Sequence, residues 1–138
     1  MSHCFWLPLS DIQPSQLYVS KGKLARVWDW WRPPHLKSFS ALPVKRLKGR
    51  VIFTDGHTRA FAAYQMGFQH VPVYWDEDAL DWEAYQICVD WCLDANIQTV
   101  MDLAGRMLTP EDYQHLWLDR CQTMQTALAR RRQSNGIS

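Results

Sequence analysis

The chain has 138 residues, of which 47% are hydrophobic, so it can build a globular core and is not a disordered protein. Its formal net charge of +1 predicts no general attraction to nucleic acid or to an anionic membrane surface. No apolar run approaches about 18 residues, and residues 1–9 are too short for a signal peptide, so we expect no membrane partner. Four cysteines without such a signal indicate reduced thiols and a cytoplasmic protein.

The first part of the chain predicts one edge strand and one short helix. Residues 5–9 form the strand, and Pro8 places it at a sheet edge because proline cannot donate to a β-ladder. Residues 21–31 follow as a helix with apolar side chains at helical spacing, and Pro33 and Pro34 end it.

Two further strands are predicted in the middle of the chain. Residues 42–44 and 51–54 are apolar or β-branched, which favours strands. We expect residues 45–50 to form the turn between them, with Gly49 available for a positive φ.

The second of these strands opens a strand–turn–helix–strand unit. Asp55-Gly56 is a sharp turn signal, and the residues from 58 to 66 favour a helix. Gly67 stands where a helix C′ glycine belongs, and residues 71–75 form the returning strand.

After residue 78 the sequence favours helices and gives no further strand signal. Three helices are expected: over residues 80–94, after Thr99 with Asp102 at its third position, and from Thr109-Pro110 to Arg132. The basic run Arg130–Arg132 then complements the negative end of the last helix dipole.

The pattern as a whole predicts an α+β fold, with a small mixed sheet followed by helices. We expect a sheet domain over residues 1–78, a C-terminal helical subdomain over residues 79–133 that packs on it, and a tail over residues 134–138.

The turn that contains Asp55 and Gly56 has the residue types of an anion site. A helix start leaves backbone N–H groups unpaired, and a glycine there lets an anion approach the backbone closely. Arg59 can donate two hydrogen bonds to a phosphate, while Thr58 offers a hydroxyl and His57 an imidazole. Asp55 has three open roles: it can cap the helix, hold a metal ion or accept a proton. The alternative is a plain turn with a helix cap, which needs no ligand.

The segment 51–67, followed by Val-Pro-Val at 71–73, resembles the central block of the ParB/sulfiredoxin superfamily. That block joins an apolar strand and Asp-Gly-His-x-Arg to an Ala-rich helix, a glycine and a Val-Pro-Val strand. Residues 7–14 and 42–44 are similar to the family's preceding strands. The resemblance covers residues 6 to 77 and implies the ParB/sulfiredoxin-like fold.

The resemblance also implies a ligand. Members of the superfamily bind ATP, ADP or CTP at this loop, usually with magnesium. Carried over to this chain, the phosphate contacts come from Gly56, His57, Thr58 and Arg59, and Asp55 is the candidate magnesium ligand.

Departures from the family separate its branches. Sulfiredoxins carry a cysteine directly after the loop glycine, and His57 stands there, so sulfinic-acid reduction is excluded. Partitioning ParB proteins carry a Gly-Glu-Arg-Arg type box, of which only the glycine and the arginine match. The loop is nearest to the ADP-dependent free-serine kinase branch, with Thr58 in place of its second histidine. The upstream glutamate base of that branch is missing, and Asp29 or Asp11 is the possible substitute.

We therefore expect a nucleotide- or phosphate-binding protein, and a small-molecule kinase or nucleotide hydrolase if it is an enzyme. Asp55, His57 and Asp29 are the catalytic candidates. The alternatives are a non-catalytic adaptor with a protein partner and a ParB-like DNA-associated protein. Two acids, Glu111 and Asp112, open the last helix and argue against DNA as a partner.

Two cysteines share one face of the predicted helix over residues 80–94. Cys88 and Cys92 are four residues apart, so they lie on the same side of it. Burial in the core is the commoner role for free cysteines, and a metal site completed by His115 or Cys121 is the alternative.

Overall fold

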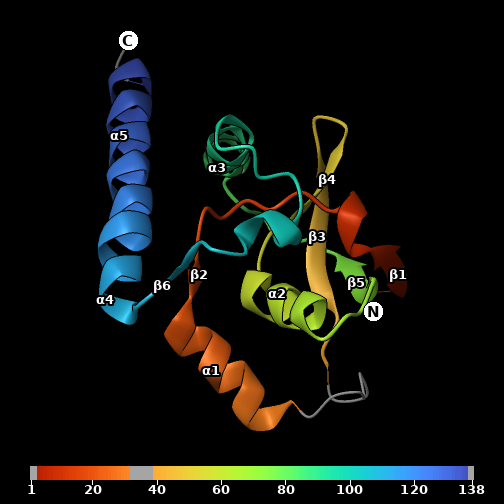
Figure 1. Ribbon diagram of the computed structural model, residues 1–138. Coiled ribbons are helices and arrows are strands. Elements are labelled where there is room, and N and C mark those ends of the chain that lie inside the picture. Colours follow the sequence, from red (N-terminus) through yellow and green to blue (C-terminus); the bar gives the residue numbers. More distant parts are fainter. Residues whose placement is uncertain (1–2, 32–38, 137–138) are drawn as a thin grey trace.

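The computed structural model describes residues 3–31 and 39–136 and shows a mixed α/β fold (Figure 1). The main sheet has the order β1-β5-β3-β4, from β1 (Cys4–Pro8), β5 (His70–Trp75), β3 (Leu42–Leu47) and β4 (Arg50–Phe53). The β1–β5 and β3–β4 pairs are antiparallel and the β3–β5 pair is parallel, so the sheet is mixed, as the sequence predicts. β1 lies at an edge, which suits Pro8.

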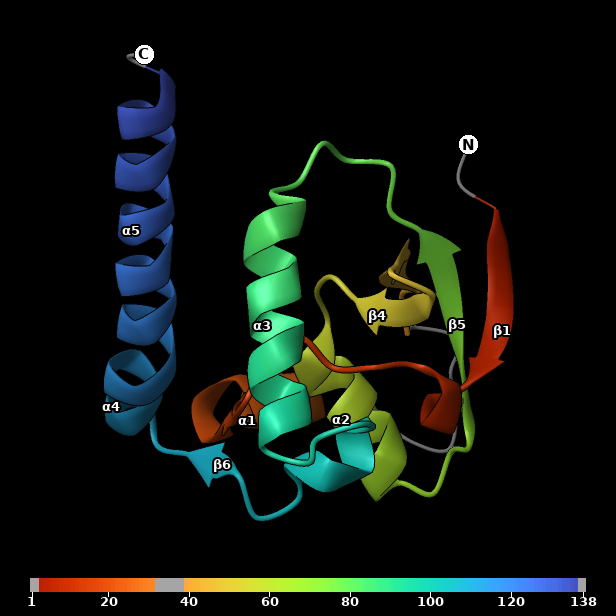
Figure 2. The ribbon, with the colours of Figure 1, turned by 90° about the horizontal axis from the view of Figure 1, so that it is seen from above.

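One face of the sheet is buried under helix α2 (His57–Gln65), which lies between the sheet and α1 (Lys21–Trp30) (Figures 1 and 2). Val73 pairs with Leu42, so their side chains share a face of the sheet, and both are fully buried. Phe61 of α2 belongs to the same apolar cluster and is 1% exposed. Burying a side chain of that size contributes about 1.5–3 kcal/mol, so this contact fixes α2 against the sheet.

The C-terminal part is helical and begins with α3 (Trp82–Asp94). A 3-10 turn (Val100–Leu103), a short strand β6 (Met107–Leu108), α4 (Pro110–Tyr113), a π-helical turn (Gln114–Leu118) and α5 (Asp119–Gly136) follow. Both views place α5 at the side of the molecule, beyond α3 (Figures 1 and 2). One cluster of buried apolar side chains contains residues from the sheet and from these helices.

Two expectations about strands are wrong. The turn between β3 and β4 is only Lys48-Gly49, with φ of +48° and +79°, because β3 continues three residues beyond its expected end and β4 begins one residue before its expected start. A further strand exists after residue 78, since β6 pairs in parallel with β2 (Val19–Ser20). Two-residue strands carry too little periodicity to be predicted from sequence.

Two expectations about helices also need correction. Asp102 accepts hydrogen bonds from the N–H groups of Gln98 and Thr99, but the helix expected there is a single 3-10 turn. Helix α5 continues to Gly136, so residues 134–136 are not part of a tail. Helix α1 ends as expected, while Pro33 and Pro34 lie outside the described residues.

The basic end of α5 does more than complement a helix dipole. Arg132 contacts Asp81 and Glu83 at 2.9 Å each, and Arg131 also pairs with Glu83. These contacts lower the pKa of both carboxyl groups, chiefly through hydrogen bonds from the arginines. The pairs are exposed and individually weak, and they join the end of α5 to the start of α3.

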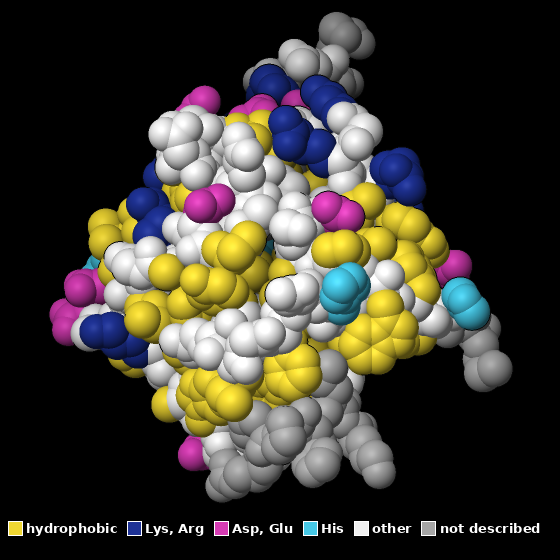
Figure 3. All heavy atoms as spheres, turned by 45° about the vertical axis from the view of Figure 1, so that its right-hand side comes forward, with side chains coloured by type: hydrophobic (Ala, Val, Ile, Leu, Met, Phe, Trp, Pro, Cys, Tyr) yellow, Lys and Arg dark blue, Asp and Glu magenta, His cyan; other side chains and the backbone are white. Residues whose placement is uncertain are grey.

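Several large apolar side chains remain on the surface of the chain. Trp6 is 55% exposed and Trp30 46%, whereas Trp31 is fully buried and stacks on Trp28. Figure 3 views the side that carries β1 and β5 and shows apolar patches separated by polar side chains. Within the described residues, no helix combines the length and apolar composition that a membrane span requires.

Candidate functional site

The backbone turns sharply between β4 and α2 because of one glycine. Gly56 has φ of +77°, a left-handed conformation that other residues adopt only with strain. A Cβ atom at this position would stand 2.8 Å from Leu42 Cδ2 and 3.0 Å from Arg59 Nη2. Both the conformation and the lack of space therefore require glycine here.

Asp55 does not cap α2. Its Oδ1 atom accepts a 2.8 Å hydrogen bond from the N–H of Gly56, so its side chain stabilises the turn itself. Among the residues that the structure describes, no side chain makes a capping hydrogen bond at the start of α2. The carboxylate is exposed and keeps Oδ2 for another contact.

The first turn of α2 presents unpaired amide groups. Among the described residues, no acceptor bonds to the N–H groups of His57, Thr58 or Arg59. These are the donors that the start of an α-helix leaves without partners, and they carry the positive end of the helix dipole. Thr58 and Arg59 are partly exposed, so solvent reaches this end of the helix.

Arg59 bends back over the loop. Its Nη1 atom donates to the carbonyl oxygen of Ser40 at 3.0 Å, and its guanidinium lies beside Gly56. Partial burial lowers the pKa of Arg59, against the opposing charge of Asp55, but the group remains a cation at any ordinary pH. The Ser40 contact holds this cation next to the unpaired amides.

His57 lies inside the protein. It is 4% exposed, and its Nε2 atom accepts a 2.9 Å hydrogen bond from the N–H of Ser15. Burial lowers the pKa of His57 to about 4, so the ring is neutral at neutral pH and carries its proton on Nδ1. His57 therefore brings no positive charge to a phosphate, and its Nε2 atom is not free to act as a base.

Backbone pairing brings Ser15 to His57. The N–H of Gln13 donates to Val51 at 2.8 Å, and the N–H of Phe53 donates to Gln13 at 3.0 Å. The chain before Ser15 therefore runs along the outer edge of β4 and delivers the Ser15 amide to the imidazole.

A cavity of about 260 Å³, the amide cavity, opens at the start of α2. It is bounded by Gln16, by residues 55–59, and by Lys23, Val27 and Trp30 of α1. The three α1 residues lie on one face of that helix because their spacing is four and three. The charge of Lys23 is close enough to contribute to the lowered pKa of His57. Two cations, Lys23 and Arg59, thus flank the unpaired amides.

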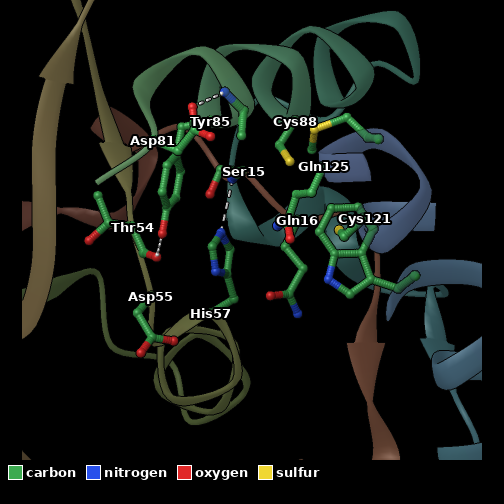
Figure 4. A pocket seen from close by; sticks show the side chains of 13 residues that line it. Ser15, Gln16, Thr54, Asp55, His57, Asp81, Tyr85, Cys88, Cys121 and Gln125 are labelled. Atoms are coloured by element: carbon green, nitrogen blue, oxygen red, sulfur yellow. Dashed lines mark hydrogen bonds between the residues drawn. The ribbon is translucent and has the colours of Figure 1, made fainter. Parts of the chain in front are cut away.

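A second cavity of about 200 Å³, the thiol cavity, lies between the loop, α3 and α5 (Figure 4). Tyr85 lines it and donates its hydroxyl to the carbonyl oxygen of Thr54 at 2.8 Å. Burial raises the pKa of Tyr85 to about 12, so the hydroxyl keeps its proton. Gln16, Asp55 and His57 line both cavities, so Asp55 stands where the two adjoin.

The structure does not bring the other predicted acids to the loop. Asp29 is exposed on α1 and lines neither cavity. Asp11 lies in a 3-10 turn (Leu9–Asp11) beside a different cavity, with Arg50 and Gln98. No group of three metal-binding side chains gathers within the described ranges.

A nucleotide with magnesium fits these residues on one condition. Amides and two cations suit a phosphate, and magnesium is commonly held by one or two carboxylates together with substrate phosphates. The magnesium ion would have to bind together with the phosphate, because Asp55 alone supplies too few ligands to hold it.

Some site residues carry no signal in the sequence. Lys23 comes to the loop only through the packing of α1 on α2, and the contact between Tyr85 and Thr54 spans 31 residues. In the sequence, Ser15 resembles an ordinary turn residue before the first helix. The one local clue was the shared face of Lys23, Val27 and Trp30.

Comparison with known proteins gives information about the fold and none about the function. No family model and no curated protein matches the chain. A solved structure, protein Atu1540 from Agrobacterium tumefaciens, is similar with a TM-score of 0.51 and 15% sequence identity. The match covers 75% of this chain and 62% of that chain, so this chain spans less than two thirds of that protein's length.

Proposed function

We propose that this protein binds the phosphate groups of a nucleotide, or of another phosphorylated small molecule, at the start of α2. The observation that carries the proposal is the set of unpaired N–H groups at His57, Thr58 and Arg59, which meet a cavity flanked by two cations. An anion at this place satisfies donors that otherwise rely on water.

The two cations act in different ways. Arg59 is held by Ser40 and can add a charge-assisted hydrogen bond to a phosphate from its remaining N–H groups. Lys23 is an exposed point charge on α1, and its Nζ atom also lies 5.1 Å from the centre of the Tyr113 ring. We expect Arg59 to contribute more to affinity, because the bonds of a preorganised guanidinium cost less entropy.

The negative charge of Asp55 opposes anion binding unless a cation lies between its carboxylate and the bound phosphate. Its exposed carboxylate borders the same cavity, and like charges at about 4 Å repel by about 1 kcal/mol in water and by more near protein. When magnesium is bound to the phosphate, the Asp55 carboxylate can bind the ion, and the two negative groups no longer repel each other directly. The arrangement therefore favours a nucleotide–magnesium complex over the free nucleotide.

Trp30 offers a place for the base. Its indole is 46% exposed and borders the amide cavity, whereas the neighbouring Trp31 is buried in the core. Stacking of a base on an aromatic ring contributes about 1–3 kcal/mol and tolerates any base. We therefore expect weak discrimination among ATP, ADP, CTP and GTP.

Catalysis would depend on Asp55. His57 is neutral and engaged by Ser15, and Asp29 lines neither cavity, so Asp55 is the carboxylate that can take a proton where the cavities adjoin. A kinase or nucleotide hydrolase would use it in that role. The same arrangement equally suits a module that binds without turnover, and an assay of phosphate release separates an enzyme from such a module.

The sequence supports the same proposal in a second way. Asp-Gly-His-x-Arg between a strand and an Ala-rich helix resembles the ParB/sulfiredoxin superfamily, and the strand–turn–helix context of that motif is present. The ParB/sulfiredoxin-like fold is part of this proposal.

The test is binding of each nucleotide, with and without magnesium, by thermal shift and isothermal calorimetry. Arg59→Ala should weaken binding by about tenfold or more, since a hydrogen bond to a charged group contributes about 1.5–3 kcal/mol. Lys23→Ala should weaken nucleotide binding about fivefold, because two charges about 4 Å apart in water interact by about 1 kcal/mol.

Lys21→Ala is the matched control, because Lys21 is exposed on the same helix and lines neither cavity. Equal affinity in all three variants, or no stabilisation by any nucleotide, contradicts the proposal.

A further inference from the structure

Two cysteines that are 33 positions apart in the sequence meet at the wall of the thiol cavity. Cys88 comes from α3 and Cys121 from α5, and the two thiols are near enough for each to shift the pKa of the other. Both line the cavity that Figure 4 shows from close by. The two helices also meet through the surface ion pairs of Arg131 and Arg132, and Trp91 of α3 packs against Trp117 in the π-helical turn before α5.

The two thiols differ in reactivity. Cys121 is partly exposed, and its pKa is lowered by the neighbouring Cys88 thiol and by the charge of Arg120. Cys88 is 8% exposed, and its pKa is raised by the neighbouring Cys121 thiol and by burial. Cys121 is therefore the thiol that a small disulfide in solution reaches first, and its thiolate is the nucleophile in disulfide chemistry.

The other two cysteines lack this arrangement. Cys92 is fully buried, and burial raises its pKa to about 12. Cys4 is exposed on the edge strand β1, and neither of them lines the thiol cavity. A metal site is also not built here, because no third ligand joins the pair among the residues with described positions.

We propose that Cys88 and Cys121 form a reversible disulfide by exchange with a small disulfide such as oxidised glutathione. The Cys121 thiolate attacks one sulfur of that disulfide, the bond between its two sulfurs breaks, and the leaving thiolate takes a proton. Cys88 then loses its proton and attacks the Cys121 sulfur, which releases the second small thiol. In total, one small disulfide is reduced to two thiols and the two protein thiols are oxidised to one bond.

The bond changes the wall of the thiol cavity. It fixes α5 to α3 at the level of the cavity, where Met124 and Gln125 of α5 also line the wall. The reduced pair leaves this contact to packing and exposed ion pairs. The proposal does not depend on nucleotide binding, since neither cysteine lines the amide cavity.

The test exposes the folded full-length chain to oxidised glutathione and measures its intact mass and peptide map. A Cys4→Ser, Cys92→Ser double variant serves as the background, because it keeps only the proposed pair. We expect a product lighter by two hydrogen atoms, a Cys88–Cys121 cross-linked peptide, a higher melting temperature and full reversal by dithiothreitol. A lasting glutathione adduct without an internal bond, or no reaction at all, overturns the proposal.

Single variants test the two roles. Cys88→Ser should stop the reaction at a stable glutathione adduct on Cys121, whereas Cys121→Ser should leave Cys88 unmodified over the same time. Faster modification of Cys88 than of Cys121 overturns the assignment of the nucleophile. Circular dichroism of each variant confirms the fold, and the unmutated chain gives the cross-link result even if a variant unfolds.

Discussion

The buried imidazole of His57 makes the stability of the fold depend on pH. Its pKa falls from the ordinary value of 6.5 to about 4 in the folded protein, so the unfolded chain binds more protons between these values. Stability is then complete above pH 6.5 and decreases as the pH falls toward 4. The full difference is about 3 kcal/mol, since each pKa unit corresponds to about 1.4 kcal/mol.

Most of this change falls in a window where carboxylates are still ionised. Between about pH 7 and about pH 5, linkage predicts a loss of about 2 kcal/mol in the free energy of unfolding. Urea unfolding followed by tryptophan fluorescence measures it, and the chain carries eight tryptophans as probes. His57→Gln is the control, because glutamine does not titrate. Its stability should be nearly flat over the window, whatever its absolute value.

If the unmutated chain and His57→Gln lose stability in parallel between these pH values, the ring is not held neutral by burial. The hydrogen bond from Ser15 to Nε2 would then not describe the protein in solution, and His57 would again be available as a cation.

Three further predictions concern the loop and α5. Gly56→Ala should destabilise the fold by about 2 kcal/mol in urea unfolding, because its φ is +77° and the new Cβ would meet Leu42, and an unchanged midpoint argues against this geometry. Asp55→Asn should tighten nucleotide binding without magnesium and reduce the gain from magnesium in calorimetry, whereas an unchanged magnesium dependence shows that Asp55 faces neither ion nor phosphate. Arg132→Ala should lower the melting temperature slightly, and less so in high salt, whereas a large salt-independent loss would show that its bond to Asp81 is not a surface ion pair.

Local sequence was enough to predict the strand–turn–helix unit. The Asp55-Gly56 turn, the helix after it and the glycine at position 67 each depend on neighbours in the chain, and all are present. The mixed sheet followed from the same segments. The short strands β2 and β6 could not be predicted, because they exist only through pairing across 88 positions of sequence.

The candidate site was predicted only in part, for a similar reason. Residue type made His57 a phosphate ligand, but its burial and its bond to Ser15 arise from a contact across 42 positions. Asp29 has the right chemistry and lies on the wrong side of α1. Lys23 and Ser40 entered the site through tertiary packing that a linear pattern does not contain.

Phosphate binding at this site requires that negative charge settles at the start of α2. Nuclear magnetic resonance of the 15N-labelled chain, titrated with ATP and magnesium, observes the relevant N–H groups one by one. We expect the amide signals of His57, Thr58 and Arg59 to shift first and to saturate together, while the amide signals of Cys4 and of α5 do not shift. Saturating shifts elsewhere with these three signals unmoved would contradict this expectation.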